Sequence, residues 1–408
     1  MSSTSDVPVI AYYLPQFHAI PENDAWWGTG FTEWTNVRKS EPLFEGHLQP
    51  YGPSIDLGHY DLSDQRILKA QFELARTNGI DAFCFYHYWF DGKRLLNTPV
   101  DQFLESDTEG HFCLSWANEN WTRRWDGKEH EILIAQRYDV NTADAVFDSF
   151  LPALKDRRYF RLEERLVLLV HRVDHIPNAS KVAHRWRARA REEGLGELLL
   201  IASETTFGLD PSSYGFDAVA EFPPVGANDF SVAWRTPARG LIDGFDGRLM
   251  SYRRLAQRYM KRKDAKFVRY RGITPSWDNT PRRGAKATVF VGSTPALFGA
   301  WAASSLRKEA QRQGSGMLFV NAWNEWAEGA VLEDSEAYGL SYLEAIRGGA
   351  PTHSEPKSVP VLGRWSVGFT KSLALTMAGT TKHTVQRLVM RVRRILKGTG
   401  AKSLGPTD

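Results

Sequence analysis

The sequence has very few cysteines: Cys84 and Cys113 are the only two among 408 residues. Both lie in apolar stretches that are typical of strands, so a disulfide framework is not expected and a reducing compartment fits. The first eight residues contain no basic stretch followed by an apolar one, so no signal peptide is apparent. We therefore expect the protein to be cytoplasmic.

Long apolar runs and an excess of one charge are also missing. No apolar run approaches the ~20 residues that a membrane-spanning helix needs. The formal net charge is only +3, whereas proteins that bind nucleic acid usually carry a strongly basic face. These two absences argue against a transmembrane protein and against nucleic acid as a partner.

Several nucleotide and cofactor motifs are absent too. There is no GxGxxG after a strand, no Walker-type loop and no GxSxG elbow. No Asp-x-Asp is present that would hold a metal against a nucleotide diphosphate, which weighs against a metal-dependent nucleotide-sugar transferase. His18, His87 and His171 do not have the spacing of a metal site. We expect no metal and no cofactor.

Aromatic residues are abundant, with 14 tryptophans, 14 tyrosines and 22 phenylalanines. A single tryptophan is best explained as core filling. Many of these tryptophans, however, lie beside polar residues. Because sugars present flat C–H faces ringed by hydroxyls, a site that combines tryptophan planes with carboxylates and amides suits an oligosaccharide or polysaccharide substrate.

Short apolar runs alternate with amphipathic stretches along most of the chain. The expected strands are 9–17, 80–88, 112–117, 166–171, 198–202, 218–222, 268–276 and 318–323, and the expected helices are 64–78, 142–154, 180–193, 248–261, 294–313 and 337–347. Eight such strands predict an α/β protein with a (β/α)₈ TIM barrel and long βα loops. A doubly wound open sheet has the same alternation.

Polar and aromatic residues gather directly after six of these strands, and in a barrel such strand ends meet on one face. The candidate binding residues there are Tyr13, Gln16, His18, Tyr86, His87, Trp116, Asn118, Trp121, Trp277, Asn279, Trp323, Asn324 and Trp326. The barrel is therefore preferred over the open sheet.

Two segments fall outside the repeat. The stretch 21–59 is too long for a simple connection, and its aromatic content favours a wall or lid of the pocket. We divide the chain into a catalytic domain, 1–350, and a C-terminal extension, 351–408. In the extension, 383–397 reads as a short basic amphipathic helix. Two interpretations stay open for it: packing on the barrel, or peripheral contact with an anionic inner membrane.

Glu325 and Glu328 are the best catalytic pair. Cleavage of a glycosidic bond needs one carboxyl that protonates the leaving oxygen and another carboxylate that acts from the sugar side. Glu325 ends an apolar run, and Glu328 precedes Gly329, which permits a sharp turn. An aromatic environment should raise the pKa of one of the two carboxyls. The alternatives are a surface pair, or a helix-capping role for Glu328.

Other charged residues are candidates for binding hydroxyls. Glu119 could bind sugar or orient a catalytic carboxyl, and a salt bridge to Arg123 or Arg124 is an equal alternative. Glu33, which lies next to Trp34, and Glu221 are weaker candidates for the same roles, and Trp34 is a candidate substrate contact. Asp278, with Arg282 and Arg283, could bind hydroxyls or an acidic group, or form a buried structural network. Arg123 itself is a candidate substrate contact.

Long motifs carry a family resemblance across residues 10–347. They are Tyr13–His18, Trp27–Val37, Tyr86–Phe90, Trp116–Asp126, Trp277–Arg283 and Asn321–Gly329. On these motifs the sequence resembles the WbsX-like family, proteins of bacterial surface-polysaccharide gene clusters that are often labelled glycosyltransferases. That family in turn is similar to the retaining endo-α-mannosidases of glycoside hydrolase family 99, which have a (β/α)₈ barrel. The resemblance implies that Glu325 is the base that assists the sugar 2-hydroxyl, and that Glu328 is the acid and then the base.

Three functions follow as hypotheses. The first is a retaining glycoside hydrolase-like enzyme that acts on a surface-polysaccharide or O-antigen glycan. The second is a glycosyltransferase of polysaccharide biosynthesis, since a retaining site becomes a transferase when it excludes water and holds an acceptor sugar. The third is a glycan-binding protein without catalysis.

Overall fold

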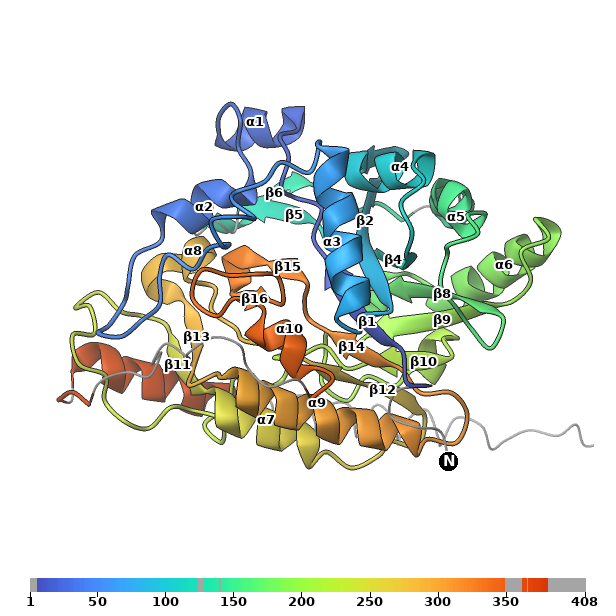
Figure 1. Ribbon diagram of the computed structural model, residues 1–408. Coiled ribbons are helices and arrows are strands. Elements are labelled where there is room, and N and C mark those ends of the chain that lie inside the picture. Colours follow the sequence, from blue (N-terminus) through green and yellow to red (C-terminus); the bar gives the residue numbers. More distant parts are fainter. Residues whose placement is uncertain (1–5, 124–127, 139–140, 349–361, 365, 381–408) are drawn as a thin grey trace, which may run out of the picture.

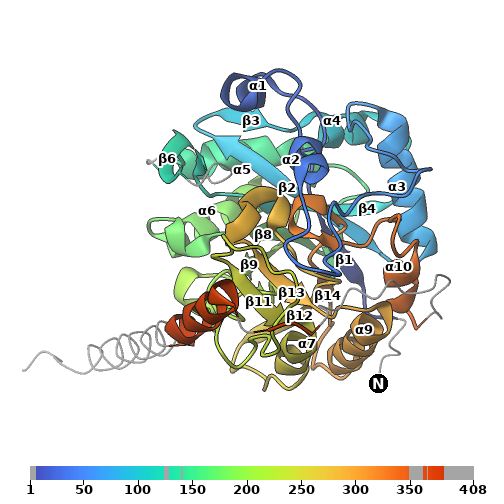
Figure 2. The same cartoon turned by 90° about the vertical axis from the view of Figure 1, so that its left-hand side faces the viewer.

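The architecture is a closed parallel barrel with helices outside it (Figures 1 and 2). The structure is a computed structural model that describes residues 6–123, 128–138, 141–348, 362–364 and 366–380. The barrel strands are β1 (Val9–Tyr13), β2 (Ala82–Phe90), β4 (His111–Trp116), β8 (Arg165–Val170), β9 (Leu198–Ser203), β10 (Ala218–Ala220), β12 (Val268–Ile273) and β14 (Leu318–Val320). The pairing of β1 with both β14 and β2 closes the ring. The predicted (β/α)₈ barrel is confirmed.

The barrel strands form where the sequence predicted them, because a parallel strand is buried on both faces and is apolar throughout. Every residue of β1 and of β9 is buried, and so is every residue of β8 after Arg165. Cys84 and Cys113 are free, buried and opposite each other on β2 and β4.

Helices cover the outside of the barrel. They include α3 (Gln65–Thr77), α4 (Thr98–Glu105), α5 (Thr142–Leu154), α6 (Ala179–Glu192), α7 (Tyr252–Met260), α9 (Pro295–Ala310) and α10 (Ser341–Ala345). Two predicted helices need correction. The expected helix 248–261 begins as a strand, β11 (Arg248–Ser251), which pairs in parallel with β13 (Thr288–Val291). The expected helix 337–347 is shorter because Gly339 has a positive φ of 53°, which a helix does not tolerate.

The segment 21–59 is not an irregular loop, because it contains α1 (Pro21–Trp27) and α2 (Glu33–Lys39). Pro21 occupies the first turn of α1, where its missing N–H costs nothing. Thr32 and Thr35 form a capping box at the start of α2. Figure 1 shows both helices near the short hairpin of β5 (Trp121–Arg123) and β6 (Lys128–Ile134).

Part of the C-terminal extension packs against the barrel domain. Residues 367–380 are helical, and this red helix lies beside β11 in Figures 1 and 2. The Ser372 hydroxyl accepts a hydrogen bond from the Leu249 N–H at 2.9 Å, and Phe369 is fully buried. The predicted basic helix 383–397 lies outside the described residues.

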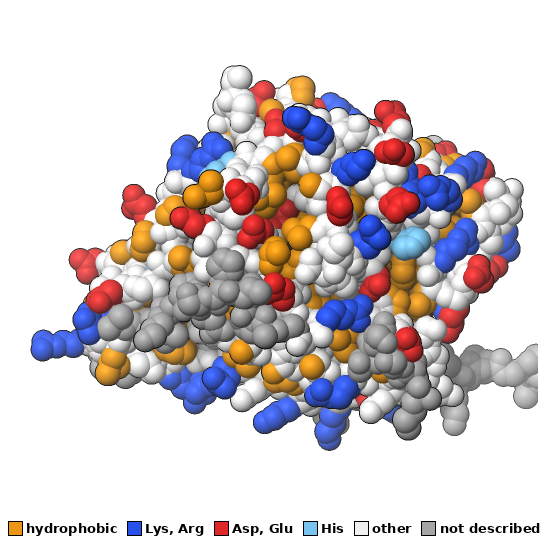
Figure 3. Space-filling view, viewed as in Figure 1, with side chains coloured by type: hydrophobic (Ala, Val, Ile, Leu, Met, Phe, Trp, Pro, Cys, Tyr) orange, Lys and Arg blue, Asp and Glu red, His pale blue; other side chains and the backbone are white. Residues whose placement is uncertain are grey.

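The described part of the chain has a mixed surface. On the face shown in Figure 3, basic and acidic side chains are interspersed, so this face is not strongly basic. Within the described ranges, no helix has the length and apolar character to cross a membrane. The same ranges contain no cluster of three or more His, Cys, Asp or Glu side chains arranged to hold a metal ion.

Candidate active site

A tight hairpin after strand β14 presents the two candidate catalytic carboxyls. The chain continues into β15 (Asn324–Glu325), a 3₁₀ turn η6 (Trp326–Glu328) and β16 (Ala330–Val331), which pairs antiparallel with β15. Gly329 has a φ of 62°, a conformation that glycine adopts without a steric penalty. The turn brings Glu325 and Glu328 to the same pocket.

Arg282 joins three carboxylates at this pocket. Its Nη2 lies 3.1 Å from Glu325 Oε2 and 3.2 Å from Glu33 Oε1, and its Nη1 lies 2.5 Å from Glu328 Oε1. Arg282 is held in the short helix α8 (Thr280–Arg283), which follows β12. One guanidinium therefore fixes the positions of both candidate catalytic groups and of Glu33.

Burial changes the proton affinity of Glu325. Its side chain is only 7% exposed, and the neighbouring Glu328 adds like charge, so the pKa rises from its usual 4.5 to about 8 despite Arg282. The pKa of one carboxyl is thus raised, as the sequence predicted, and the carboxyl concerned is Glu325. A carboxyl that keeps its proton near neutral pH is suited to acid catalysis.

The pocket has a volume of about 450 Å³, which is within the range of small-molecule sites. Aromatic side chains supply much of its wall, and polar groups lie between them. Its lining includes Asn23, Trp26, Trp27, Tyr86, Tyr88, Glu119, Trp121, His171, Phe222, Trp277, Asn279 and Arg282. Flat rings beside carboxylates and amides are the surface that a sugar requires.

Some of the predicted site residues line this pocket and others do not. Those that do are Gln16, Tyr86, Glu119, Trp121, Trp277, Asn279, Glu325 and Glu328. Glu33 contacts the site through Arg282. Those that are buried but do not line the pocket are Tyr13, His18, Trp34, His87, Trp116, Asn118, Asp278, Trp323, Asn324 and Trp326. The side chain of Arg123 lies outside the described part of the structure.

The buried residues act behind the pocket wall. Asn324 binds the backbone of Leu14, donating to its carbonyl at 3.0 Å and accepting from its N–H at 2.7 Å. Asn118 makes the same kind of contact with the backbone of Arg172. Asp278 accepts hydrogen bonds from Gln49 at 2.6 Å and contacts His47 at 2.7 Å. These polar side chains stabilise the loops that carry the pocket residues.

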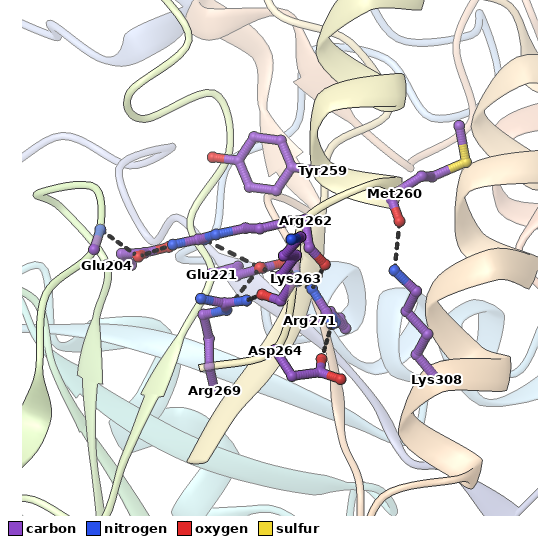
Figure 4. Close-up of polar contacts among 12 residues, drawn as sticks. Glu204, Glu221, Tyr259, Met260, Arg262, Lys263, Asp264, Arg269, Arg271 and Lys308 are labelled. Carbon is purple, nitrogen blue, oxygen red and sulfur yellow. Dashed lines mark hydrogen bonds and ion pairs between the residues drawn. The ribbon is translucent and has the colours of Figure 1, made fainter. Parts of the chain in front are cut away.

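Glu221 belongs to a buried ion cluster and does not line the pocket (Figure 4). Its Oε1 lies 3.0 Å from Arg262, 3.1 Å from Arg269 and 3.4 Å from Arg271. Glu204 pairs with Arg262 from the other side. The strand end at Glu221 turns its carboxylate toward these arginines, so the expectation of a sugar contact is replaced by a structural role.

Glu119 does line the pocket, and it pairs with an arginine that the sequence did not suggest. Its Oε1 lies 2.6 Å from Arg172 Nη1, and Arg172 also pairs with Asp174 at 3.0 Å. Arg172 follows the end of β8 and lies 53 residues after Glu119 in the sequence. Glu119 therefore forms a salt bridge with Arg172. The predicted partners, the side chain of Arg123 and Arg124, lie outside the described part of the structure, so that prediction stays a prediction.

Sequence reasoning gave too little weight to some functional residues. The sequence groups Arg282 with Asp278 and Arg283 and does not place it beside the catalytic pair. In the structure it is the cation that contacts Glu33, Glu325 and Glu328. Tyr88 and Asn23 were missed. Tyr88 follows Tyr86 by two residues on β2, so the period-2 pattern of a strand was a usable signal.

A second buried carboxyl supports the hairpin. Glu333 accepts hydrogen bonds from the Tyr60 hydroxyl at 2.7 Å and from the Trp326 indole at 2.9 Å, and also from the Gln71 amide. Burial raises its pKa from 4.5 to about 7. Because the folded state binds this proton more tightly than the unfolded state, the contribution of Glu333 to stability should be fully present below about pH 4.5 and be lost as the pH rises through 7.

Replacing Glu333 with glutamine should remove this loss of folding stability at high pH. The loss is on the order of 3 kcal/mol for a pKa rise of this size. The measurement is the free energy of unfolding in urea at pH 5 and pH 8, for the wild type and Glu333→Gln. The control is Glu163→Gln, at an exposed carboxyl. An equal pH dependence in the wild type and Glu333→Gln would contradict the prediction.

The fold and the site together define a class: a (β/α)₈ barrel with paired carboxyls at an aromatic pocket. Residues 9–346 match the family described as glycosyltransferase WbsX, and the chain belongs to that family. Two curated relatives, both called uncharacterized protein WxcX, come from strains of Xanthomonas campestris pv. campestris. Each is 41% identical over 350 residues, which cover 85% of this chain and 50% of the relative. The chain thus spans about half the length of these relatives.

Solved structures share the architecture at low sequence identity. A glycoside hydrolase-like protein superposes with a TM-score of 0.53 at 15% identity, covering 84% of this chain and 93% of that one. An endo-alpha-mannosidase of family GH99 from Bacteroides thetaiotaomicron gives a TM-score of 0.49 at 10% identity, covering 95% of this chain and 100% of that one. The similarity to the glycoside hydrolase-like protein shows a common fold.

Proposed function

We propose that the protein is a retaining glycoside hydrolase-like enzyme that acts in the cytoplasm on a bacterial surface-polysaccharide or O-antigen glycan. The observation that carries this proposal is the pair Glu325 and Glu328, held by Arg282 in a pocket walled by tryptophans. The glycan class comes from the family resemblance. Peripheral membrane contact of the stretch 383–397 stays one of the two open interpretations of that stretch.

The chemistry divides between the two carboxyls. One donates a proton to the leaving oxygen, and the other, ionised, removes the proton from the sugar hydroxyl that attacks the anomeric carbon. The motif resemblance gives the acid role to Glu328 and the base role to Glu325. The raised pKa of Glu325 favours the opposite order in the empty pocket. The geometry of the pocket supports a catalytic role for both carboxyls. The roles to be tested are those of the motif resemblance, with Glu328 as the acid and Glu325 as the base.

The second candidate function is glycosyl transfer, which the family description favours. A transferase of this kind would use the same two carboxyls with an acceptor sugar in place of water. The two functions therefore differ in what the enzyme consumes and not in its catalytic residues.

Product analysis by mass spectrometry separates the two functions. The purified protein is incubated with polysaccharide repeat units from its host, with and without nucleotide sugars. Shorter fragments formed without any nucleotide sugar would support the hydrolase. Extension of the repeat units only when a nucleotide sugar is present would replace it with the transferase. Absence of both reactions, with binding retained, would leave a glycan-binding protein.

A further inference from the structure

A second pocket adjoins the active-site pocket. It has a volume of about 560 Å³ and shares three wall residues with the first: Phe222, Trp277 and Asn279. Its other wall residues include Thr205, Phe207, Arg248, Arg258, Thr288 and Phe290. A chain of sugars that passes Trp277 would therefore extend from the carboxyl pair into this second space.

The alternation of strands β11 and β13 builds one wall of the second pocket. Successive side chains of a strand point to opposite faces. Leu249, Val289 and Val291 enter a small hydrophobic core on one face. On the other face, Arg248, Thr288 and Phe290 line the pocket, with Arg248 directly opposite Thr288 in the strand register. The position of Arg248 is therefore fixed by the backbone of a packed two-stranded sheet.

Arg248 is a half-buried cation without a carboxylate partner among the described residues. Its buried Nε has no hydrogen-bond partner. The pKa of its guanidinium is lowered, first by burial and then by the like charge of Arg283. The nearby Arg258 differs, because Asp229 neutralises it at 2.6 Å. A partly desolvated charge without a counter-ion is costly, and a bound anion would offset that cost.

A second polar group without a hydrogen-bond partner lines the same pocket. The buried Thr205 hydroxyl has no hydrogen-bond partner, although a hydroxyl both donates and accepts. Buried polar groups are usually hydrogen-bonded, so each exception needs an explanation. The pocket thus offers the Arg248 guanidinium to an oxyanion, and Phe222 and Trp277 offer aromatic surface to sugar rings.

We propose that this second pocket, the Arg248 pocket, binds an anionic group carried by the glycan substrate, with Arg248 as the residue that recognises the oxyanion. The inference rests on the proposed function, because it treats the pocket as the continuation of a glycan-binding groove. The shared chemistry is a carboxylate of an acidic sugar or a phosphate that links sugar to its carrier. Arginine suits both, since its planar fork binds either group through two hydrogen bonds.

The test is isothermal titration calorimetry with three probes: trigalacturonate, a neutral galactotriose and inorganic pyrophosphate. Trigalacturonate or pyrophosphate should bind, and Arg248→Gln should weaken that binding about ten-fold or more, because a charge-assisted pair is lost. Binding of galactotriose should change by less than about two-fold. Arg248→Lys keeps the charge without the fork and should recover part of the affinity. The control is Arg66→Gln, at an exposed arginine on α3.

The outcomes separate the inference from the proposed function. Dependence on Arg248 for trigalacturonate alone assigns the anion to an acidic sugar, and dependence for pyrophosphate alone assigns it to a phosphate. Binding of both anions that is unchanged in Arg248→Gln, or binding of neither anion, overturns the inference. The titration can therefore disprove anion binding in the Arg248 pocket without affecting the catalytic role of Glu325 and Glu328. In the same way, the catalytic role can be disproved without affecting anion binding.

Discussion

Replacing Glu328 with glutamine is expected to lower the rate of glycosidic bond cleavage by about 10²- to 10⁴-fold, which is the usual contribution of a positioned acid or base. Glutamine has almost the same shape, so it keeps the hydrogen bond to a sugar but transfers no proton. The 2.5 Å contact between Glu328 and Arg282 would become a contact to a neutral amide. The measurement is kcat/KM on the natural glycan, with fold integrity checked by circular dichroism.

Comparison with Glu325→Gln then assigns the roles of the two carboxyls. A substrate with an aryl leaving group needs little protonation, so the variant that lacks the acid should keep most activity on it. The variant that lacks the base should be slow on both substrates. We expect Glu328→Gln to be rescued by the aryl glycoside and Glu325→Gln not to be. Activity within ten-fold of the wild type in both variants would remove the pair from catalysis.

Replacing Arg282 with methionine is expected to give the second large effect, in stability as well as activity. The change would leave Glu33, Glu325 and Glu328 together without their shared cation, and the Glu33 side chain is completely buried. Removal of one partner from a buried ionic group typically costs about 3–5 kcal/mol. Activity should fall with it, because the guanidinium positions both candidate catalytic carboxyls.

The pH dependence identifies the cause of the lost stability. Protonation of the buried Glu325 lowers the repulsion among the three carboxyls, so Arg282→Met should be most destabilised at pH 8 and less so at pH 5. Urea unfolding at both pH values measures this difference. The matched control is Arg66→Met, whose exposed partner is Asp64 and which should cost little at either pH. An equal loss at both pH values would mean that Arg282 contributes packing and not charge.

Local pattern was sufficient for the barrel because the strands are specified by their own residues. A strand buried on both faces must be apolar along its length, and runs such as Leu198–Ser203 meet that requirement in isolation. The prediction from sequence was wrong at β11, because Arg248–Ser251 leads directly into the amphipathic helix α7 with no change in the pattern of polar and apolar residues. The partner of that strand, β13, lies about 40 residues away, so local periodicity does not reveal the pairing.

The sequence by itself determined the barrel, the family motifs and the pair Glu325 and Glu328, since all three depend on neighbouring residues. Only the tertiary structure decided which polar strand-end residues face the pocket. Glu33 and Arg282 are 249 residues apart, and their contact exists only after the barrel has closed. Glu221 and Asn324 turn away because buried arginines and a backbone amide satisfy them there. The direction of a side chain at a loop depends on partners from distant elements, and those partners are fixed by the fold.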